Sequence, residues 1–211
     1  MIKILVPEDS TVLDPDDSQF LIPKHILTQD QLNDWEQSNI IEAEKWLFSN
    51  QKTEILTVRF VQVLHKKMFD RTWKWAGNFR KTNKNIGIDW PFINLALGKL
   101  LEETKYYLKN NTYSVRETLV RFHHQLVFIH CFDNGNGRHA RLMSDFLLNS
   151  LGEKRFNWGK DLYCDDDNRK KYITALKKAD NYDYEDLIKF AEGELNDVKL
   201  ESKIELSSNT Q

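Results

Sequence analysis

Cysteine, glycine and proline are all scarce in this sequence of 211 residues, and each shortage excludes a class of protein. The two cysteines, Cys131 and Cys164, supply neither a disulfide framework nor a zinc knuckle, and they suit a reducing compartment. Eight glycines and four prolines leave too few turn residues for an all-β sandwich or barrel. The composition therefore favours helices from the start.

Long apolar runs and an excess of one charge are also missing. No segment approaches the roughly 18 apolar residues of a membrane span, and the first residues lack a signal-peptide core. With 30 Lys and Arg against 32 Asp and Glu, the net charge of −2 argues against a nucleic-acid footprint over the whole surface. We expect a cytoplasmic protein that does not bind membranes.

Hydrophobic periodicity and capping residues predict an all-α fold. Thr28 with Gln31, and Ser114 with Glu117, are capping boxes that mark two helix starts. The predicted helices cover residues 29–49, 54–69, 89–109, 114–130, 138–151, 167–179 and 184–198. The predicted organisation is an irregular N-terminal arm at 1–27, an N-terminal helical segment at 28–53, a main domain at 54–199 and a flexible tail at 200–211.

The most informative segment lies between two strongly apolar helices, at residues 130–141, and reads His-Cys-Phe-Asp-Asn-Gly-Asn-Gly-Arg-His-Ala-Arg. Gly135 and Gly137 can adopt positive φ, so that successive backbone N–H groups point into one concavity. The N-terminal end of the following helix adds positive charge to this nest. Such an arrangement is typical of a phosphate-binding site.

Three side chains of the same segment could bind phosphate oxygens or transfer a proton beside the nest. Arg138 and Arg141 lie three residues apart, on one side of the helix, where they can hold further phosphate oxygens. His130 is placed as a general base, because its ordinary pKa is near neutral. The segment therefore indicates phosphoryl or nucleotidyl transfer.

A transition-metal site is the alternative interpretation of the same region. His123, His124, His130 and His139 lie close together in the sequence, near Cys131. No two of these histidines have the four-residue spacing of a helical metal site, however. His123 and His124 are expected to be polar groups satisfied within the helix packing.

The segment resembles the Fic motif, His-x-Phe-x-acid-Gly-Asn-Gly-Arg-x-x-Arg, and departs from it only at the acidic position. The resemblance to the Fic/DOC family extends over about residues 54–192. With the N-terminal part included, the chain resembles the subfamily called mobile mystery protein B, which is associated with bacterial mobile elements. The resemblance implies an all-α Fic-type helical domain with a small β-hairpin flap.

The resemblance also implies an activity, that of a protein adenylyltransferase. His130 would deprotonate a Ser, Thr or Tyr hydroxyl of a target protein, which would attack the α-phosphate of ATP with pyrophosphate leaving. Phe132 would anchor the loop in the core. The residues implied to hold the phosphates are Gly135, Asn136, Gly137, Arg138 and Arg141.

The acidic position, which in the family binds magnesium, is Asn134 in this chain, with Asp133 one residue earlier. Either residue would be the Mg²⁺ ligand, so the dependence on magnesium stays open. Two other functions also stay open: a related transferase that uses another nucleotide or moves a phosphate, and a catalytically idle nucleotide-binding regulatory module.

Two further elements follow from the resemblance. The flap, which would pair with the target as an added strand, comprises Lys81, Thr82, Asn83, Lys84, Asn85, Ile86, Gly87 and Ile88. Ser38 and Glu42 resemble the inhibitory motif of the family, in which Glu42 would pair with Arg141; a plain surface carboxylate is the alternative for Glu42. A homo-oligomer and a regulatory partner protein are left open.

Overall fold

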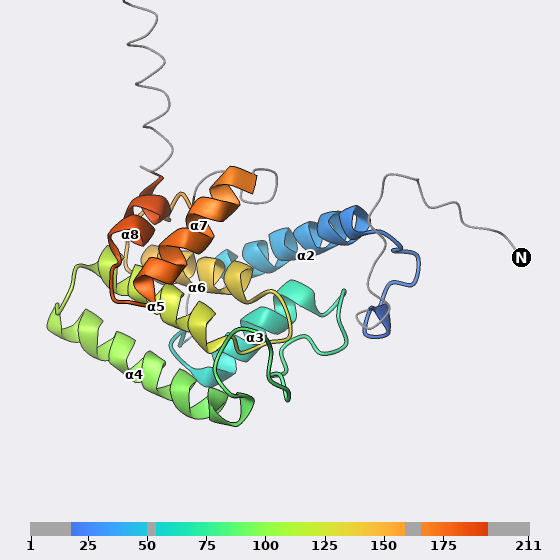
Figure 1. Ribbon diagram of the computed structural model, residues 1–211, viewed down its shortest axis with the longest axis horizontal. Helices are drawn as coiled ribbons and strands as arrows, with labels where there is room; N and C mark the ends of the chain where they lie inside the picture. Colours follow the sequence, from blue (N-terminus) through green and yellow to red (C-terminus); the bar gives the residue numbers. More distant parts are fainter. Residues whose placement is uncertain (1–17, 50–53, 159–165, 194–211) are drawn as a thin grey trace, which may run out of the picture.

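The computed structural model describes residues 18–49, 54–158 and 166–193. Most of the predicted arm at 1–27 and the whole predicted tail at 200–211 lie outside these residues. The described part is all-α, as the sequence predicts, and Figure 1 shows its helices. They are α2 (Gln29–Ser49), α3 (Val58–Phe69), the 3₁₀ turn η1 (Trp90–Phe92), α4 (Ile93–Asn110), α5 (Val115–Ile129), α6 (Asn136–Ser150), α7 (Asp166–Ala179) and α8 (Glu185–Glu192).

The Thr28 and Gln31 capping box forms in full, and of the Ser114 and Glu117 box the Ser114 cap forms, while the Glu117 carboxylate binds Arg121. The Thr28 hydroxyl accepts from the Gln31 amide at 3.3 Å, and the Gln31 side chain accepts in return from the Thr28 N–H. The Ser114 hydroxyl accepts from the Glu117 amide at 3.1 Å at the start of α5. Because these side chains satisfy N–H groups that a helix leaves open, the helices begin where the sequence predicts.

Helices α5 and α6 form the centre of the molecule (Figure 1). Helix α4 packs on α5, while α2 and α3 pack on each other and both contact α6. Helices α7 and α8 form a pair, of which α8 contacts α5. The turn from α5 to α6, which carries residues 130–135, is therefore fixed at both ends by buried helices.

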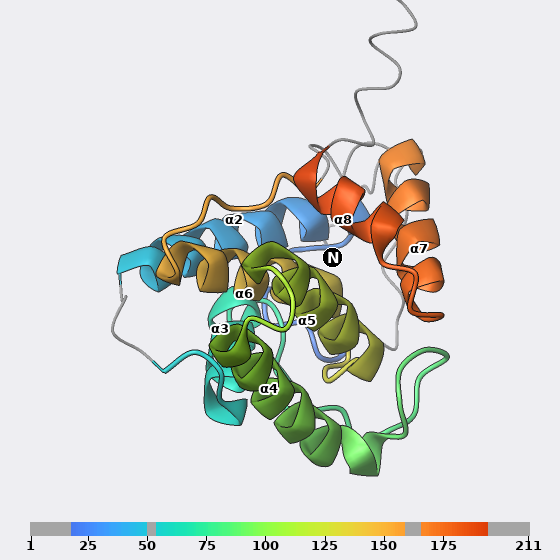
Figure 2. The same ribbon diagram turned by 90° about the vertical axis from the view of Figure 1, so that its left-hand side faces the viewer.

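The predicted hairpin at residues 81–88 is not formed. Within the part of the chain that the structure describes, no residue belongs to a strand, and the only β-bridge joins Leu21 and Trp73. The loop that precedes α4 extends from the helices as an irregular turn (Figure 2). Its ends are held by the side chain of Arg80, which donates to the carbonyls of Thr82 and Ile88, rather than by cross-strand backbone bonds.

Four helix boundaries differ from the prediction by more than one residue. Helix α4 begins at Ile93 rather than at 89, because the 3₁₀ turn η1 precedes it, and α8 ends at Glu192 rather than at 198, where Gly193 has a left-handed conformation. Helix α3 begins at Val58 rather than at 54, because Thr57 caps it with its hydroxyl. Helix α6 begins at Asn136 rather than at Arg138, because Gly135 supplies the left-handed cap.

In the described ranges, no helix is both long and apolar enough to cross a membrane.

Candidate active site

The candidate site is built around the turn between α5 and α6. His130 ends α5 with φ 55° and ψ 61°, a left-handed conformation that is uncommon outside glycine and costs about 1–3 kcal/mol. Gly135, with φ 79°, begins α6. The chain thus reverses direction within residues 130–135, and the surrounding structure must hold this strained turn in place.

A buried ring stack holds the middle of the turn. Phe132 is fully buried, as its predicted role as an anchor requires, and its ring stacks on His65 with centroids 3.6 Å apart. His65 also bonds the carbonyl of Asn134 through Nε2 at 3.0 Å, while its Nδ1 accepts from the Gly77 N–H. These bonds fix one neutral tautomer, and burial holds the pKa of His65 well below its usual value.

The side chain of Asn136 braces the same turn. Its Oδ1 accepts from the Phe132 N–H at 2.9 Å, and its Nδ2 donates to the Phe132 carbonyl at 2.8 Å. Both polar ends of this buried amide are therefore used inside the protein. Only the backbone N–H of Asn136 is left for the predicted contact with a phosphate.

The two glycines of the predicted nest have different conformations. Gly135 has positive φ, and a Cβ there would lie 2.5 Å from the ring of Phe69, so no larger residue fits. Gly137 instead lies within the first turn of α6 and is not among the positive-φ residues, so the prediction that it adopts positive φ is wrong. Its missing side chain leaves room beside Tyr172 and Arg141.

The N-terminus of α6 is open to an anion. No side chain caps it, so its first N–H groups and the positive end of the helix dipole are available to a ligand. The guanidinium of Arg138 lies over the ring of Phe69, and that of Arg141 lies over the ring of Tyr172. Both arginines are thus placed on rigid aromatic surfaces at the start of the helix.

Arg138 already has a carboxylate partner. Its guanidinium binds Glu36 of α2 at 2.5 Å, and the other Glu36 oxygen accepts from the indole N–H of Trp73 at 2.6 Å. Glu36 is 2 % exposed, so its charge is desolvated and held by two donors. This bond uses one terminal nitrogen of Arg138, and the Glu36 charge beside it opposes the approach of an anion to this guanidinium.

The imidazole of His130 is half-buried and suited to act as a base. Burial, and then the positive charges of Arg80 and Lys84, lower its pKa below the usual value, while the Val127 carbonyl and Asp133 act in the opposite direction. The ring is therefore neutral at pH 7 and can accept a proton.

The two candidate magnesium ligands are engaged within the chain. The Asn134 side-chain oxygen accepts from the Gly135 N–H at 2.6 Å, and the Asp133 carboxylate binds Lys84 at 2.9 Å. Mg²⁺ prefers free carboxylate oxygens, and in the described ranges no three His, Cys, Asp or Glu side chains are grouped to hold a metal. These residues do not fit a Mg²⁺ ion as they stand.

The histidines of the alternative metal site bond to residues of the chain. His124 bonds Asp180 at 2.9 Å and is satisfied by packing as the sequence predicts, whereas His123 bonds the Tyr172 hydroxyl at 2.9 Å through Nε2 and its buried Nδ1 has no hydrogen-bond partner in the described ranges. Burial raises the pKa of the Cys131 thiol to about 12, which keeps it protonated and a poor ligand.

The loop at 81–88 lies beside the turn. All of its residues are exposed except Ile88, which is half-buried, and Ile86 keeps 63 % of its surface in contact with solvent. Lys84 reaches Asp133 of the turn. Asn83 bonds both Asp89 and the Trp90 N–H, which joins the loop to the start of α4.

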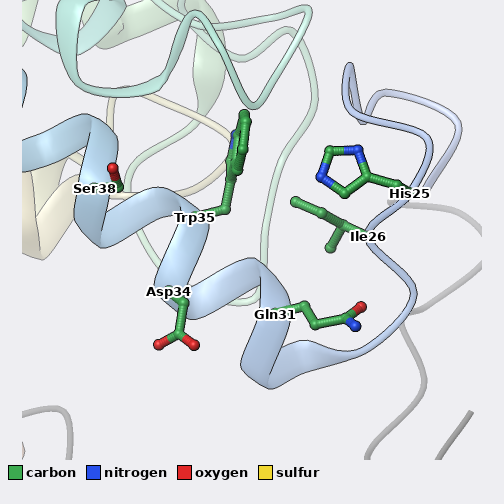
Figure 3. Close-up of a pocket in the computed structure, with 6 residues that line it drawn as sticks. All are labelled: His25, Ile26, Gln31, Asp34, Trp35 and Ser38. Atoms are coloured by element: carbon green, nitrogen blue, oxygen red, sulfur yellow. The ribbon is translucent and has the colours of Figure 1, made fainter.

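The two residues of the predicted inhibitory motif lie on the outside of α2. Glu42 is half exposed and binds Arg71 at 2.5 Å, which matches the plain surface interpretation. Ser38 lines a surface pocket of about 340 Å³ between α2 and the segment before it (Figure 3). The pocket is lined by His25, Ile26, Gln31, Asp34, Trp35 and Ser38.

Sequence reasoning assigned no role to three residues around the site: His65 and Arg80, which contact the turn, and Glu36, which binds Arg138. A signal for Glu36 was present, because it falls on the same face of α2 as the buried Leu32 and Ala43. His65 and Arg80 act through contacts with residues far away in the sequence, which no local pattern reveals.

Comparisons with known proteins agree with this geometry. Residues 55–148 match the Fic/DOC family model. The fold is similar to that of the N-terminal Fic domain of Bep8 from Bartonella sp. 1-1C, with a TM-score of 0.64 and 16 % identity over 80 % of this chain and 87 % of that one. It is also similar to BepC from Bartonella tribocorum, crystallised with AMPPNP, with a TM-score of 0.65 and 16 % identity over 89 % and 93 % of the two chains.

A third similar structure is the N-terminal Fic domain of a cell filamentation protein from Bartonella quintana with bound ADP. Its TM-score is 0.63, with 16 % identity over 88 % of this chain and 91 % of that one. The motif, the fold and the family match coincide on the same helices and on the turn that joins them. The segment from residue 55 to residue 148 therefore belongs to the Fic/DOC family.

Proposed function

We propose that this protein is a nucleotide-binding transferase that moves AMP from ATP to a Ser, Thr or Tyr hydroxyl of a target protein. One observation carries the proposal. A neutral, half-buried His130 lies at one end of a braced turn whose other end is the uncapped N-terminus of α6, followed by Arg138 and Arg141. The structures of BepC with AMPPNP and of the Bartonella quintana protein with ADP support a nucleotide as the ligand of such a site.

The chain's own residues account for the transfer as follows. His130 takes the proton of the target hydroxyl, and the hydroxyl oxygen attacks the α-phosphorus of ATP. The bond from that phosphorus to the β-phosphate oxygen breaks, and pyrophosphate leaves. The N–H groups of Asn136 and Gly137 hold the phosphates, joined by that of Gly135 once it leaves the Asn134 side chain. Arg138 balances the charge of the leaving pyrophosphate, and Arg141 holds the γ-phosphate.

The loop at 81–88 is the proposed docking segment for the target. It is exposed, borders the turn through Lys84 and Asp133, and presents the apolar side chain of Ile86. The backbone N–H and C=O groups between Thr82 and Ile88, whose own carbonyls accept from Arg80, are those that an extended target segment would need for pairing. The loop would take a strand-like form only with the target in place.

The proposal includes inhibition within the chain, with Glu36 in the role first predicted for Glu42. Glu36 neutralises Arg138, so it competes with any phosphate for that guanidinium. Glu42, bound to Arg71, serves as the matched control on the same helix. Glu36→Gln keeps an oxygen for the Trp73 indole and removes only the charge.

Intact-mass measurement after incubation with ATP and Mg²⁺ tests the function, with self-modification as the readout. The variants are Glu36→Gln, Glu42→Gln, and Glu36→Gln combined with His130→Ala. We expect an added AMP that increases in Glu36→Gln, stays unchanged in Glu42→Gln and disappears in the double variant, while ATP binding persists. Equal yields from Glu36→Gln and its His130→Ala derivative would exclude His130 as the base.

Two other outcomes would favour the alternative functions. An added phosphate in place of AMP, or transfer only from another nucleotide, indicates a related transferase. ATP binding without transfer in any form, even with added target extracts, favours an idle regulatory module. Asn134 supports that alternative, since its side-chain oxygen is used by the Gly135 N–H, and Asn134→Asp would then be needed for activity.

A further inference from the structure

Arg80 is the largest of the fully buried side chains, with 1 % of its surface exposed. A buried guanidinium needs acceptors for its donors and compensation for its charge. In the described ranges, no carboxylate lies within ion-pair distance of Arg80, and the hydrogen-bond acceptors of its guanidinium are backbone carbonyl oxygens. This is an unusual placement for an arginine, and its acceptors show what it holds together.

Two of the four acceptors belong to the end of α5. The Nε of Arg80 donates to the carbonyl of His130 at 2.6 Å, and one terminal nitrogen donates to the carbonyl of Ile129 at 3.4 Å. These are carbonyls that a helix leaves open at its C-terminus, where the helix dipole is negative. The charge of Arg80 is therefore balanced by the end of the helix that carries His130.

The other two acceptors are in the loop. Arg80 donates to the carbonyls of Thr82 and Ile88, which lie at the two ends of the loop. The Arg80 N–H itself donates to the Cys131 carbonyl at 3.0 Å. One residue thus joins both ends of the loop to both sides of His130.

Gly87 shows how closely the loop lies against His130. A Cβ at this position would lie 2.5 Å from the Cβ of His130 and 2.9 Å from a terminal nitrogen of Arg80. The φ of Gly87 is 92°, a backbone conformation that glycine adopts readily and other residues rarely do. Any side chain at Gly87 would push the loop away from the base and from the guanidinium together.

We propose that Arg80 is a positioning residue that fixes the loop at 81–88 against the strained left-handed turn at His130, and so sets the geometry between the base and the docking segment. This inference rests on the proposed transfer reaction for its catalytic consequence. Among the residues that the structure describes, no hydrogen bond of Arg80 reaches the N-terminus of α6, where the phosphates would bind. It therefore affects the transfer rate and not the affinity for ATP.

Hydrogen–deuterium exchange of the full chain tests the attachment without needing activity. Arg80→Met keeps a long side chain but removes the donors, and Arg80→Lys keeps the charge but loses the fork. We expect exchange at residues 81–88 and 129–131 to increase about tenfold in Arg80→Met and less in Arg80→Lys. Arg116→Met, which removes an arginine bound to Glu192 far from the turn, should leave both segments unchanged.

Transfer and ATP binding are measured on the same variants. Arg80→Met should lower the rate of transfer by about tenfold or more, because a displacement of about 1 Å at a reacting group has effects of this size, while the Kd for ATP changes less than about twofold. Partial recovery in Arg80→Lys supports positioning. Unchanged exchange at both segments in a folded Arg80→Met, or equal changes in Arg116→Met, would overturn the proposal.

Gly87→Ala provides the second route if Arg80→Met does not fold. Gly87 is exposed, so the helices tolerate the substitution, and its new Cβ displaces the loop from the other side. We expect increased exchange at 81–88 with unchanged melting of the helices, and wild-type exchange there would contradict the proposal. If the native chain shows no transfer, the proposed function fails, whereas the exchange measurements still decide whether Arg80 holds the loop and the turn.

Discussion

Acid should destabilise this protein through His139, which lies inside the motif and is completely buried. Its Nε2 bonds the Val61 carbonyl at 3.0 Å, and burial lowers its pKa from 6.5 to about 4. Below pH 6.5 the unfolded chain binds a proton at this position that the folded chain does not bind. Stability is therefore lost as the pH falls from 6.5 to about 4, and the loss levels off below that.

The size of the effect follows from the two pKa values. At pH 4.5 His139 alone should reduce the free energy of unfolding by about 2.5 kcal/mol relative to pH 7, out of about 3.4 kcal/mol at full protonation. His65 and His123, whose pKa values are lowered chiefly by burial, add in the same direction. Asp145 acts in the opposite direction, since burial raises its pKa. Comparing the pH dependence of the native chain with that of a His139 variant cancels the contributions of His65, His123 and Asp145, which both proteins share.

Urea unfolding at pH 7 and pH 4.5 measures the effect, with His139→Gln as the variant, because glutamine keeps a donor for the Val61 carbonyl. The loss of stability between the two pH values should be smaller in His139→Gln by about 2.5 kcal/mol. His25→Gln, at an exposed histidine, is the control and should behave like the native chain. An identical pH dependence in His139→Gln and the native chain would refute the assignment of the acid sensitivity to this buried ring.

Three further predictions concern the turn. Phe132→Ala should lower the free energy of unfolding by about 3–5 kcal/mol, since it empties a fully buried site and removes the stack on His65, and thermal and urea unfolding would measure the loss. Asn136→Ala should lower the free energy of unfolding by about 2–4 kcal/mol and weaken ATP binding, because it leaves the buried N–H and carbonyl of Phe132 without partners. Calorimetric titration with ATP measures the affinity, and an unchanged affinity would contradict the prediction. The rate of transfer should fall on the acid side with a half-maximum below pH 6.5, since burial and then Arg80 lower the pKa of His130. A rate profile measured from pH 5 to 8 tests this, and a half-maximum above pH 6.5 would argue against His130 as the base.

The sequence predicts the helical framework well because the signals are local. Thr28 with Gln31, and Ser114 with Glu117, define helix starts through bonds that span three residues. The all-α class is confirmed, and so is the Fic/DOC assignment from the motif. The hairpin at 81–88 was predicted wrongly, because the contacts that close this loop come from the side chain of Arg80 and not from paired backbones.

The contacts that organise the candidate site are not local, and the sequence did not reveal them. Arg80 reaches carbonyls 49 and 50 residues away, and His65 reaches Asn134, 69 residues away. The sequence does not distinguish a buried arginine or histidine from an exposed one, and only the packed fold determines which carbonyls the side chain contacts. The motif identifies the turn, but it does not identify the residues that hold the turn in its strained form.

The pairing of Arg138 is the exception, since the sequence contained its signal. On α2 the buried residues Leu32, Ile40 and Ala43 are spaced by eight and three, and Glu36 lies four residues from both Leu32 and Ile40, on the same face. A carboxylate in an apolar stripe must find a partner, because burying it alone costs too much. Glu42, six residues later, falls on another face and binds Arg71 at the surface. The position of a charge on the helix, more than its place in a short motif, therefore indicates which carboxylate can reach the arginines of the turn.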